Sequence, residues 1–594
     1  MSHASKQQLL DQANHYIVAQ QWDEAVKVLY VGVKQYPEFY EAWLLFSRGL
    51  YEVGHIREAV QIVQHAEQLD PLQPDFQHIQ QCMQRQALAE AEQRARQMLS
   101  HTANHPKACF TLASIALTQN QPDESIACLE PATKVHPANA TLCHLLSTSY
   151  DKAGRFEDAI KEATRLVSLD NGPDPLWMLI NLLLRYGQYL ALLTRCDEAE
   201  KLLASNPQAL SKLNVIRGQA YRILGKREQS IRCLQASLNA NANNADAWWA
   251  LADFKNYHFS NDEKAKLGGL VNSNVPAHIR CPATFAYAKL SEAENRPAES
   301  FALYKQANAL KNTAGFTPLA IQKECENRIH TYRRQSLASQ APIDHQQPVP
   351  IFIVGLPRSG STLIEQMLAS HTQIEGTIEQ PTLPAIERQA ERLAAKQYGC
   401  NLSDALHQLK SDELASLGQA YLDNGRLFRT GERQFFTDKQ PFNYRLVGLI
   451  HKILPQAKII DVRRNPMDCG YSLYKQYFPH GVYFSYDLAH IADAFNAYEA
   501  LMHHWDDVLP GKVLKVQYEN LVVAPEDELK RILHYIGLPF EQSCLNFQYS
   551  GRAVHTASSE QVRQPINFNG IDRWKPVANE LDDLKKRLNS LKMA

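Results

Sequence analysis

The stretch Gly355–Thr362, GLPRSGST in one-letter code, follows the apolar segment 351–354 and leads into an apolar helical segment that continues through Leu368. Glycines at this spacing let the backbone curl so that several N–H groups converge on one anion. The positive end of the helix that follows reinforces them. The stretch therefore predicts a strand, a phosphate-binding loop and a helix in succession. The plain alternative is a glycine turn between a strand and a helix that binds nothing.

The loop lacks the lysine of nucleoside triphosphatases. Those proteins carry Lys at the position of Ser361, because that lysine reaches the β- and γ-phosphates. Its absence argues against hydrolysis of ATP or GTP. Arg358 lies within the loop instead, and its planar guanidinium can bind two oxygens of one anion.

Beyond the loop, short buried-strand candidates alternate with helical segments. Residues 458–462 and 513–516 are short candidates of this kind. Such alternation predicts an α/β domain with a parallel sheet. We expect it to occupy residues 349–594.

The first half of the chain carries a degenerate repeat of about 34 residues, the tetratricopeptide period. Its expected turn positions are Gln20, Gly54, Asn120, Gly154, Gly187, Gly225 and Asn295. A small residue follows five places after most of them, namely Ala25, Ala59, Ser125, Ala159, Ser230 and Ser300. Prolines recur where each second helix must stop, at Pro37, Pro71, Pro106, Pro137 and Pro207.

These signals predict an α solenoid of seven to nine tetratricopeptide-like helix pairs over residues 1–325. The polar segment 326–348 is expected to be a linker to the α/β domain. The apolar stripe of the repeats forms the core between them. The concave face of such an array can also bind a peptide, and the sequence leaves that open.

Composition limits the partners. Lys and Arg total 62 against 63 Asp and Glu, so no overall charge attracts nucleic acid or an anionic membrane. The N-terminus lacks the apolar stretch of a secretory signal, and the run 176–184 is far short of the roughly 20 residues that span a bilayer. Eleven dispersed cysteines are typical of reduced thiols, so we expect a cytoplasmic protein. No metal site is expected, since His503 and His504 lack the spacing of helical ligands.

Pro357–Thr362 resembles the 5′-phosphosulfate loop of sulfotransferases, with Ser361 where that motif often has Thr. Arg464 follows the strand candidate 458–462, and Ser472 lies eight residues further on, about two turns along the next helix. Sulfotransferases bind the donor's 3′-phosphate with Arg and Ser at this spacing. The resemblance implies 3′-phosphoadenosine 5′-phosphosulfate as co-substrate, with no metal. It implies that the 5′ end of the donor is bound by Arg358, Ser359, Gly360, Ser361 and Thr362.

Further segments resemble the tyrosylprotein branch of that family. They are 438–441 (DKQP), 518–521 (YENL), 558–565 (SSEQVRQP) and 573–574 (RW). The resemblance implies that Lys439 stabilises the departing oxygen and that Ser558 lies near the transferring group. Tyr518 and Arg573 are then expected in the donor site.

A hydroxyl acceptor needs a base, because a phenol with a pKa of about 10 is mostly protonated at neutral pH. The tyrosylprotein branch has a Glu just after its first helix, which makes Glu379 the expected base, with Glu375 as the alternative. The expected reaction is sulfuryl transfer to a hydroxyl, above all that of a protein tyrosine. The alternatives are a glycan or small-molecule acceptor, a small-molecule kinase, or an adaptor without activity. A protein or peptide acceptor bound by the repeats is the expected partner, and a homodimer is left open.

Overall fold

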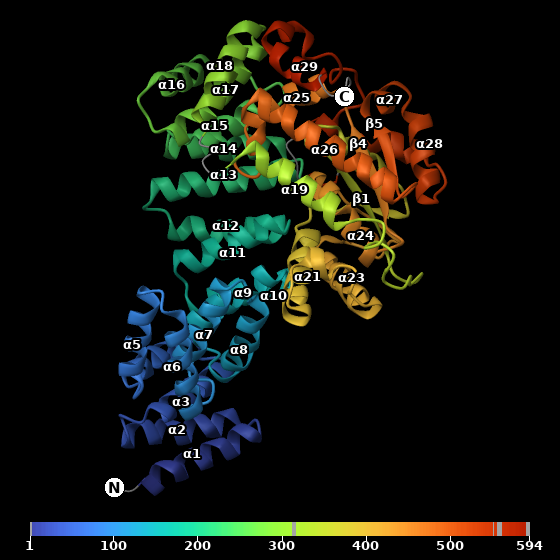
Figure 1. Ribbon diagram of the computed structural model, residues 1–594. Helices are drawn as coiled ribbons and strands as arrows, with labels where there is room; N and C mark the ends of the chain where they lie inside the picture. The colour runs from blue at the N-terminus through green and yellow to red at the C-terminus, as the bar shows by residue number, and fades with distance from the viewer. Residues whose placement is uncertain (1–2, 312–315, 551, 555–560, 590–594) are drawn as a thin grey trace. The chain divides into compact units, whose positions relative to one another are not determined.

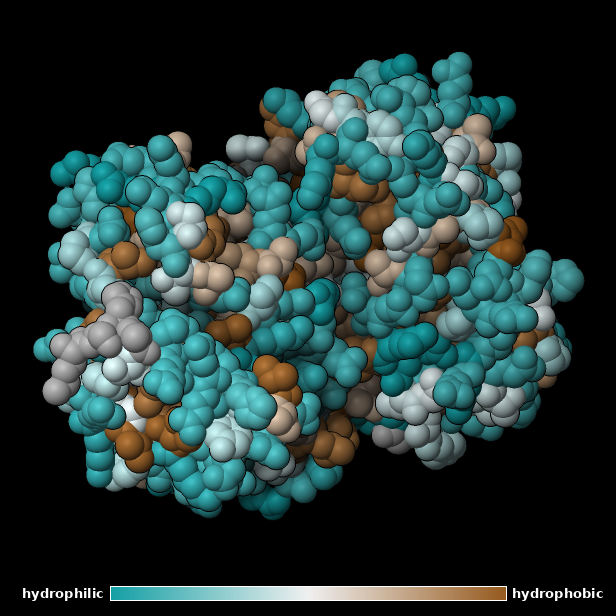
Figure 2. All heavy atoms as spheres, turned by 90° about the horizontal axis from the view of Figure 1, so that it is seen from below, coloured by the Kyte–Doolittle hydropathy of each residue, from teal (hydrophilic) through white to brown (hydrophobic). Residues whose placement is uncertain are grey.

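A computed structural model describes residues 3–311, 316–550, 552–554 and 561–589. The chain divides into two compact units, residues 1–185 and 186–594. None of the helices in the described part of the chain is long and apolar enough to cross a membrane. On the face seen in Figure 2, hydrophilic side chains predominate and apolar ones form separate patches.

The first unit consists of helices stacked in pairs (Figure 1). They are α1 (His3–Val18), α2 (Trp22–Gln35), α3 (Tyr40–Glu52), α4 (Ile56–Gln68), α5 (Gln73–Gln84), α6 (Leu88–His101), α7 (Pro106–Thr118), α8 (Pro122–Val135), α9 (Ala140–Ala153), α10 (Phe156–Leu169) and α11 (Pro173–Arg185). The second unit begins with an array of its own, made of α12 (Tyr189–Leu202), α13 (Pro207–Ile223), α14 (Arg227–Ala240), α15 (Ala245–Ala252), α16 (Asn261–Asn272), α17 (Ala277–Ala293) and α18 (Pro297–Leu310).

The repeat signals of the sequence have a backbone cause. All seven expected turn positions adopt positive φ angles, from 58° at Gln20 to 88° at Gly54, and these left-handed residues reverse the chain between two helices. The small residues five places later are at most 1% exposed, because the helices cross closely there. Gln86 and Asn256 take the same conformation at two turns that the pattern did not reveal.

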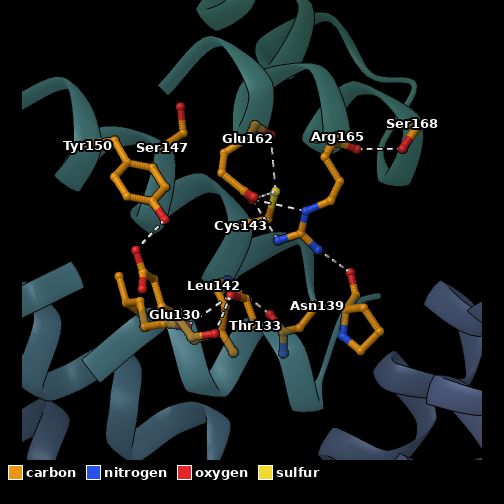
Figure 3. Close-up of polar contacts among 12 residues, drawn as sticks. Glu130, Thr133, Asn139, Leu142, Cys143, Ser147, Tyr150, Glu162, Arg165 and Ser168 are labelled. Atoms are coloured by element: carbon orange, nitrogen blue, oxygen red, sulfur yellow. Dashed lines mark hydrogen bonds and ion pairs between the residues drawn. The ribbon is translucent and has the colours of Figure 1, made fainter. Parts of the chain in front are cut away.

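Polar contacts add to this packing in the first unit (Figure 3). Tyr150 Oη of α9 donates to Glu130 of α8 at 2.8 Å. Arg165 of α10 pairs with Glu162 at 2.6 Å and also donates to the carbonyl oxygen of Pro137 at 2.7 Å. These bonds join three successive helices at their partly buried edges.

The second unit contains a five-stranded parallel sheet in the order β2-β3-β1-β4-β5. The strands are β1 (Val349–Gly355), β2 (Ile374–Glu375), β3 (Phe435–Asp438), β4 (Lys458–Arg463) and β5 (Val513–Gln517). The predicted solenoid followed by an α/β domain is therefore confirmed. β2 and β3 were not predicted, because two and four residues give too short an apolar pattern to recognise.

Helices surround the sheet, and several of them are labelled on the right side of Figure 1. They are α20 (Ser361–Ala369), α21 (Thr382–Tyr398), α22 (Leu402–Ala405), α23 (Ser411–Gly425), α24 (Val447–Ile453), α25 (Pro466–Tyr474), α26 (Leu488–Val508), α27 (Tyr518–Val523), α28 (Pro525–Ile536) and α29 (Asp582–Asn589).

One hydrophobic core joins the last repeats to this domain. Phe301 of α18 stacks on Tyr474 of α25 at 5.7 Å between ring centroids, and Phe285 of α17 contacts Tyr477 at 5.7 Å. The connecting helix α19 (Pro318–Thr331) packs on α26. Within the expected linker, Tyr332 is fully buried. Since large aromatic side chains dominate the free energy of such cores, α15–α19 are integral to the folded domain.

Candidate active site

Five of the residues expected to act on the donor and acceptor follow the carboxyl ends of strands. Arg358 comes after β1, Glu379 after β2, Lys439 after β3, Arg464 after β4 and Tyr518 after β5. The chain builds the β3 side of β1 first and then crosses to β4, so the sheet has its switch point between β1 and β4. Ligands of open α/β sheets bind at that point, outside the carboxyl ends of the strands.

The phosphate-binding loop has the backbone geometry that its sequence predicts. Gly355 has a φ of 139°, and a Cβ atom there would lie 2.5 Å from the carbonyl oxygen of Val462. Gly360 has a φ of 102°, and a side chain at this position would overlap the ring of Tyr518. Helix α20 begins at the next residue, so its N-terminal N–H groups face the loop. The Ser359 hydroxyl is buried without a hydrogen-bond partner among the described residues, as expected of a group that awaits a ligand.

Arg464 joins this loop to the rest of the site. Its Nη1 donates to the carbonyl oxygen of Arg358 at 2.9 Å, and its Nη2 donates to that of Gly570. Its guanidinium lies over the Tyr518 ring, 5.0 Å from the centroid. Arg464 Nε is buried and has no partner among the described residues. Ser472 does not contact Arg464 directly; its hydroxyl accepts from Arg358 Nε at 3.0 Å.

A cavity of about 690 Å³, large enough for a nucleotide, is lined by Arg358, Gly360, Arg464, Ser472 and Tyr518. Arg573 reaches it from the C-terminal segment, where its backbone N–H donates to Asp468 at 2.8 Å. Its side chain bonds Glu292 of α17 at 3.2 Å. Burial lowers the pKa of Arg358.

A second cavity of about 590 Å³ also borders the phosphate-binding loop. Arg358, Ser361 and Thr362 line both cavities, whereas Glu379 lines only the second. The Glu379 carboxylate pairs with the ammonium of Lys439 and is about one-third exposed (35%). The geometry therefore brings a carboxylate and a buried lysine to the loop.

Glu375 has a different environment. Its carboxylate accepts hydrogen bonds from the backbone N–H groups of Thr430 and Gly431, and it pairs with Arg429 at 3.1 Å. The side chain is 5% exposed and lines neither cavity. These contacts engage the Glu375 carboxylate at the 429–431 turn. Ser558, the remaining expected site residue, lies outside the described residues.

The structure adds lining residues that the sequence motifs did not indicate. Arg222, Asp253, Lys289 and Glu292 come from the repeat array, and Lys475 comes from the segment after α25. Glu292 pairs with Lys475 at 2.7 Å. No local signal could have marked them, because α13, α15 and α17 precede the phosphate-binding loop by more than sixty residues.

Among the described residues, His78, Cys82 and Glu90 form a group whose potential ligand atoms all lie within 4.8 Å of one another. It belongs to the first unit and to no part of this site. His78 Nε2 and Glu90 are within hydrogen-bond distance at 2.9 Å, which is a structural role for both.

Asp438 lies next to Lys439, and its pKa gives a test of the buried environment at the end of β3. Burial raises its pKa to about 7, although Tyr421 donates to it at 2.8 Å. Between about pH 4 and 7 the native carboxyl holds a proton that the unfolded chain releases, so stability falls as the pH rises through this range. We expect Asp438→Asn to remove that fall, which amounts to on the order of 2 to 3 kcal/mol between pH 5 and 8. Thermal unfolding against pH measures it, with Asp423→Asn on exposed α23 as the control. An unchanged pH profile in Asp438→Asn would contradict the assignment.

A phosphate-binding loop at the switch point of a parallel sheet, with arginines instead of the triphosphatase lysine, is typical of an α/β domain with a site for an anionic ligand. Comparison with known proteins specifies it further. Residues 350–542 match the sulfotransferase family, and residues 110–175 and 211–244 match tetratricopeptide repeats. The resemblance to both families that the sequence predicts is confirmed.

Individual relatives are distant. A protein of Aquifex aeolicus (strain VF5) described as uncharacterized is 30% identical over 332 residues, covering 54% of this chain and 43% of that protein. Protein-tyrosine sulfotransferase 1 of Danio rerio is 25% identical over 264 residues, covering 41% of this chain and 71% of the relative. The chain thus spans less than half of the Aquifex protein and about seven-tenths of the zebrafish one. Among solved structures, the sulfotransferase domain of the Synechococcus PCC 7002 olefin synthase is 23% identical, with a TM-score of 0.30, covering 40% of this chain and 90% of that one.

Proposed function

We propose that this protein transfers the sulfuryl group of 3′-phosphoadenosine 5′-phosphosulfate to the hydroxyl of a protein tyrosine. One observation supports the proposal: two cavities share residues of the phosphate-binding loop, one of them lined by Arg464 and the other by Glu379. Sulfuryl transfer, like phosphoryl transfer, proceeds in line, so donor and acceptor must approach the transferred group from opposite sides.

The donor belongs in the 690 Å³ cavity. Arg464 lines this cavity and fits an anionic end of the donor, since its buried Nε lacks a partner among the described residues. The loop and the N-terminus of α20 would bind the 5′-phosphosulfate. Arg464, Ser472 and Arg573 would bind the 3′-phosphate, with Arg573 exchanging its bond to Glu292 for the ligand.

The acceptor belongs in the second cavity, where Glu379 takes the proton of its hydroxyl. The acceptor oxygen then forms a bond to sulfur as the bond from sulfur to the 5′-phosphate oxygen breaks. Protonation of Glu379 removes the counter-ion of Lys439. The lysine ammonium and Arg358 are then available to stabilise the negative charge on the departing oxygen.

A tyrosine acceptor is supported by the similarity to protein-tyrosine sulfotransferases and by the repeats, a fold that often binds peptides. The repeat array would bind the acceptor chain and raise its effective concentration at Glu379. The chain's division into residues 1–325, 326–348 and 349–594 remains our proposal for its functional parts.

We expect the full-length protein to bind 3′-phosphoadenosine 5′-phosphate and to ignore ATP, which lacks a 3′-phosphate. Calorimetry with both nucleotides tests this, and equal affinities would remove the sulfotransferase proposal. Transfer of labelled sulfate to a tyrosine peptide, an oligosaccharide and a free phenol then tests the acceptor. Labelling of the oligosaccharide alone would replace the tyrosine acceptor by a glycan, and donor binding without any turnover would indicate an adaptor.

A further inference from the structure

One helix pair of the repeat array is interrupted at the donor cavity. Its first helix, α15, has 8 residues, whereas the corresponding helices α13 and α17 have 17 each. Residues 253–259 instead form a loop before α16 and all line the 690 Å³ cavity. The array departs from its regular geometry at the place where it meets the phosphate-binding loop.

This cavity loop, residues 253–259, is firmly held. Phe259 is 8% exposed and packs on Trp248 at 6.3 Å between ring centroids. The Tyr257 hydroxyl donates to Glu263 at 2.7 Å. The Arg222 guanidinium lies over the ring of Phe254, 4.8 Å from its centroid. An early helix end leaves carbonyl groups without intrahelical partners, which costs free energy. The contacts of the cavity loop offset that cost.

Asp253 holds two cations at the cavity wall. Its carboxylate pairs with Arg222 of α13 at 2.8 Å and with Lys289 of α17. The Asp253 side chain is 7% exposed, and its two partners are 14% and 23% exposed. Two cations around one carboxylate leave a net positive charge, and all three residues line the cavity.

This positive charge belongs to the part of the cavity wall that the repeat array supplies, and the phosphate-binding loop supplies another part. Burial is the main cause that lowers the pKa of Arg358, and the charges of Asp253, Arg464 and Arg222 act on it as well. Arg222 and Asp253 of the array therefore lie within electrostatic reach of the loop arginine.

We propose that Arg222 and Lys289, positioned by Asp253, are donor-binding residues that complete the donor site from the repeat array. The proposal rests on the proposed function. The donor's phosphosulfate and 3′-phosphate carry several negative charges, and cations on two facing walls neutralise them better than cations on one. The last helix pairs thus serve the donor directly, beyond any role in binding the acceptor.

We expect Arg222→Gln and Lys289→Gln each to weaken binding of 3′-phosphoadenosine 5′-phosphate by about tenfold or more, as for loss of a charged hydrogen bond. Lys226→Gln is the matched control. It makes the same charge change at the exposed turn before α14, outside the cavity, and should bind normally. Arg222→Lys and Lys289→Arg, which keep the charge, should recover part of the affinity.

A second measurement needs no variant. Saturating 3′-phosphoadenosine 5′-phosphate should protect Lys289 of the wild-type protein from an amine-acetylating reagent, read by mass spectrometry, while Lys226 stays reactive. Lack of protection in a protein that binds the nucleotide would overturn the proposal.

The outcomes separate this inference from the proposed function. If Arg464→Ala loses nucleotide binding while Arg222→Gln and Lys289→Gln bind like the wild type, the array does not contribute to the donor site and the function stands. If the wild type itself does not bind the nucleotide, the proposed function fails first.

Discussion

Replacing Glu379 by Gln is expected to lower the turnover number by about a hundredfold or more, with donor affinity nearly unchanged. The amide keeps the shape of the side chain but cannot take the acceptor's proton. It also removes the negative charge that pairs with the ammonium of Lys439. Initial rates with labelled donor, together with calorimetry on 3′-phosphoadenosine 5′-phosphate, give the two quantities.

Glu375→Gln is the matched control, only four residues away. Its carboxylate is engaged by Thr430, Gly431 and Arg429, so this substitution should lower thermal stability and leave the turnover of the folded protein much closer to that of the wild type. Wild-type turnover in Glu379→Gln, or a greater loss in Glu375→Gln than in Glu379→Gln, would transfer the role of base away from Glu379.

Arg464→Ala is expected to weaken binding of 3′-phosphoadenosine 5′-phosphate by on the order of 2 to 5 kcal/mol, because it leaves a buried phosphate charge without its partner. The loss should be much smaller for adenosine 5′-phosphate, which lacks the 3′-phosphate. Calorimetry with both nucleotides on the wild type and the variant separates recognition of the 3′-phosphate from a general disturbance of the site.

Arg464 also bonds the carbonyl oxygens of Arg358 and Gly570, so its removal can disturb the loop. Arg464→Lys keeps the charge and loses the planar fork, and it should bind with intermediate affinity. An equal loss for both nucleotides would indicate that Arg464 only supports the loop. It would contradict a contact with the 3′-phosphate.

The sequence predicted most of the local structure because the signals are local. Gly355 and Gly360 mark the phosphate-binding loop, since their positive φ angles disfavour other residues. The turn residues from Gln20 to Asn295 mark the helix pairs for the same reason. Strands β1, β4 and β5 were predicted from short, mainly apolar segments, whereas β2 and β3 are too short to show a period.

The sequence also indicated which residue types the site needs, through the motifs that contain Arg358 and Arg464. It could not choose between Glu379 and Glu375, which are four residues apart in one segment. Tertiary contacts separate them, because one carboxylate pairs with Lys439 beside a cavity and the other is bonded to the 429–431 turn. Their roles remain our proposal until the two variants are compared.

By itself, then, the sequence determined the order of elements, the helix turns and the anion-binding loop, because backbone conformation and hydrophobic period depend on neighbouring residues. Only the tertiary structure decided what faces that loop. Arg222, Asp253 and Lys289 reach the cavity from three helices because the aromatic core around Phe285 and Phe301 packs the last repeats against α25. Contacts between residues so far apart in the chain depend on the packing of whole elements, and no local pattern encodes them.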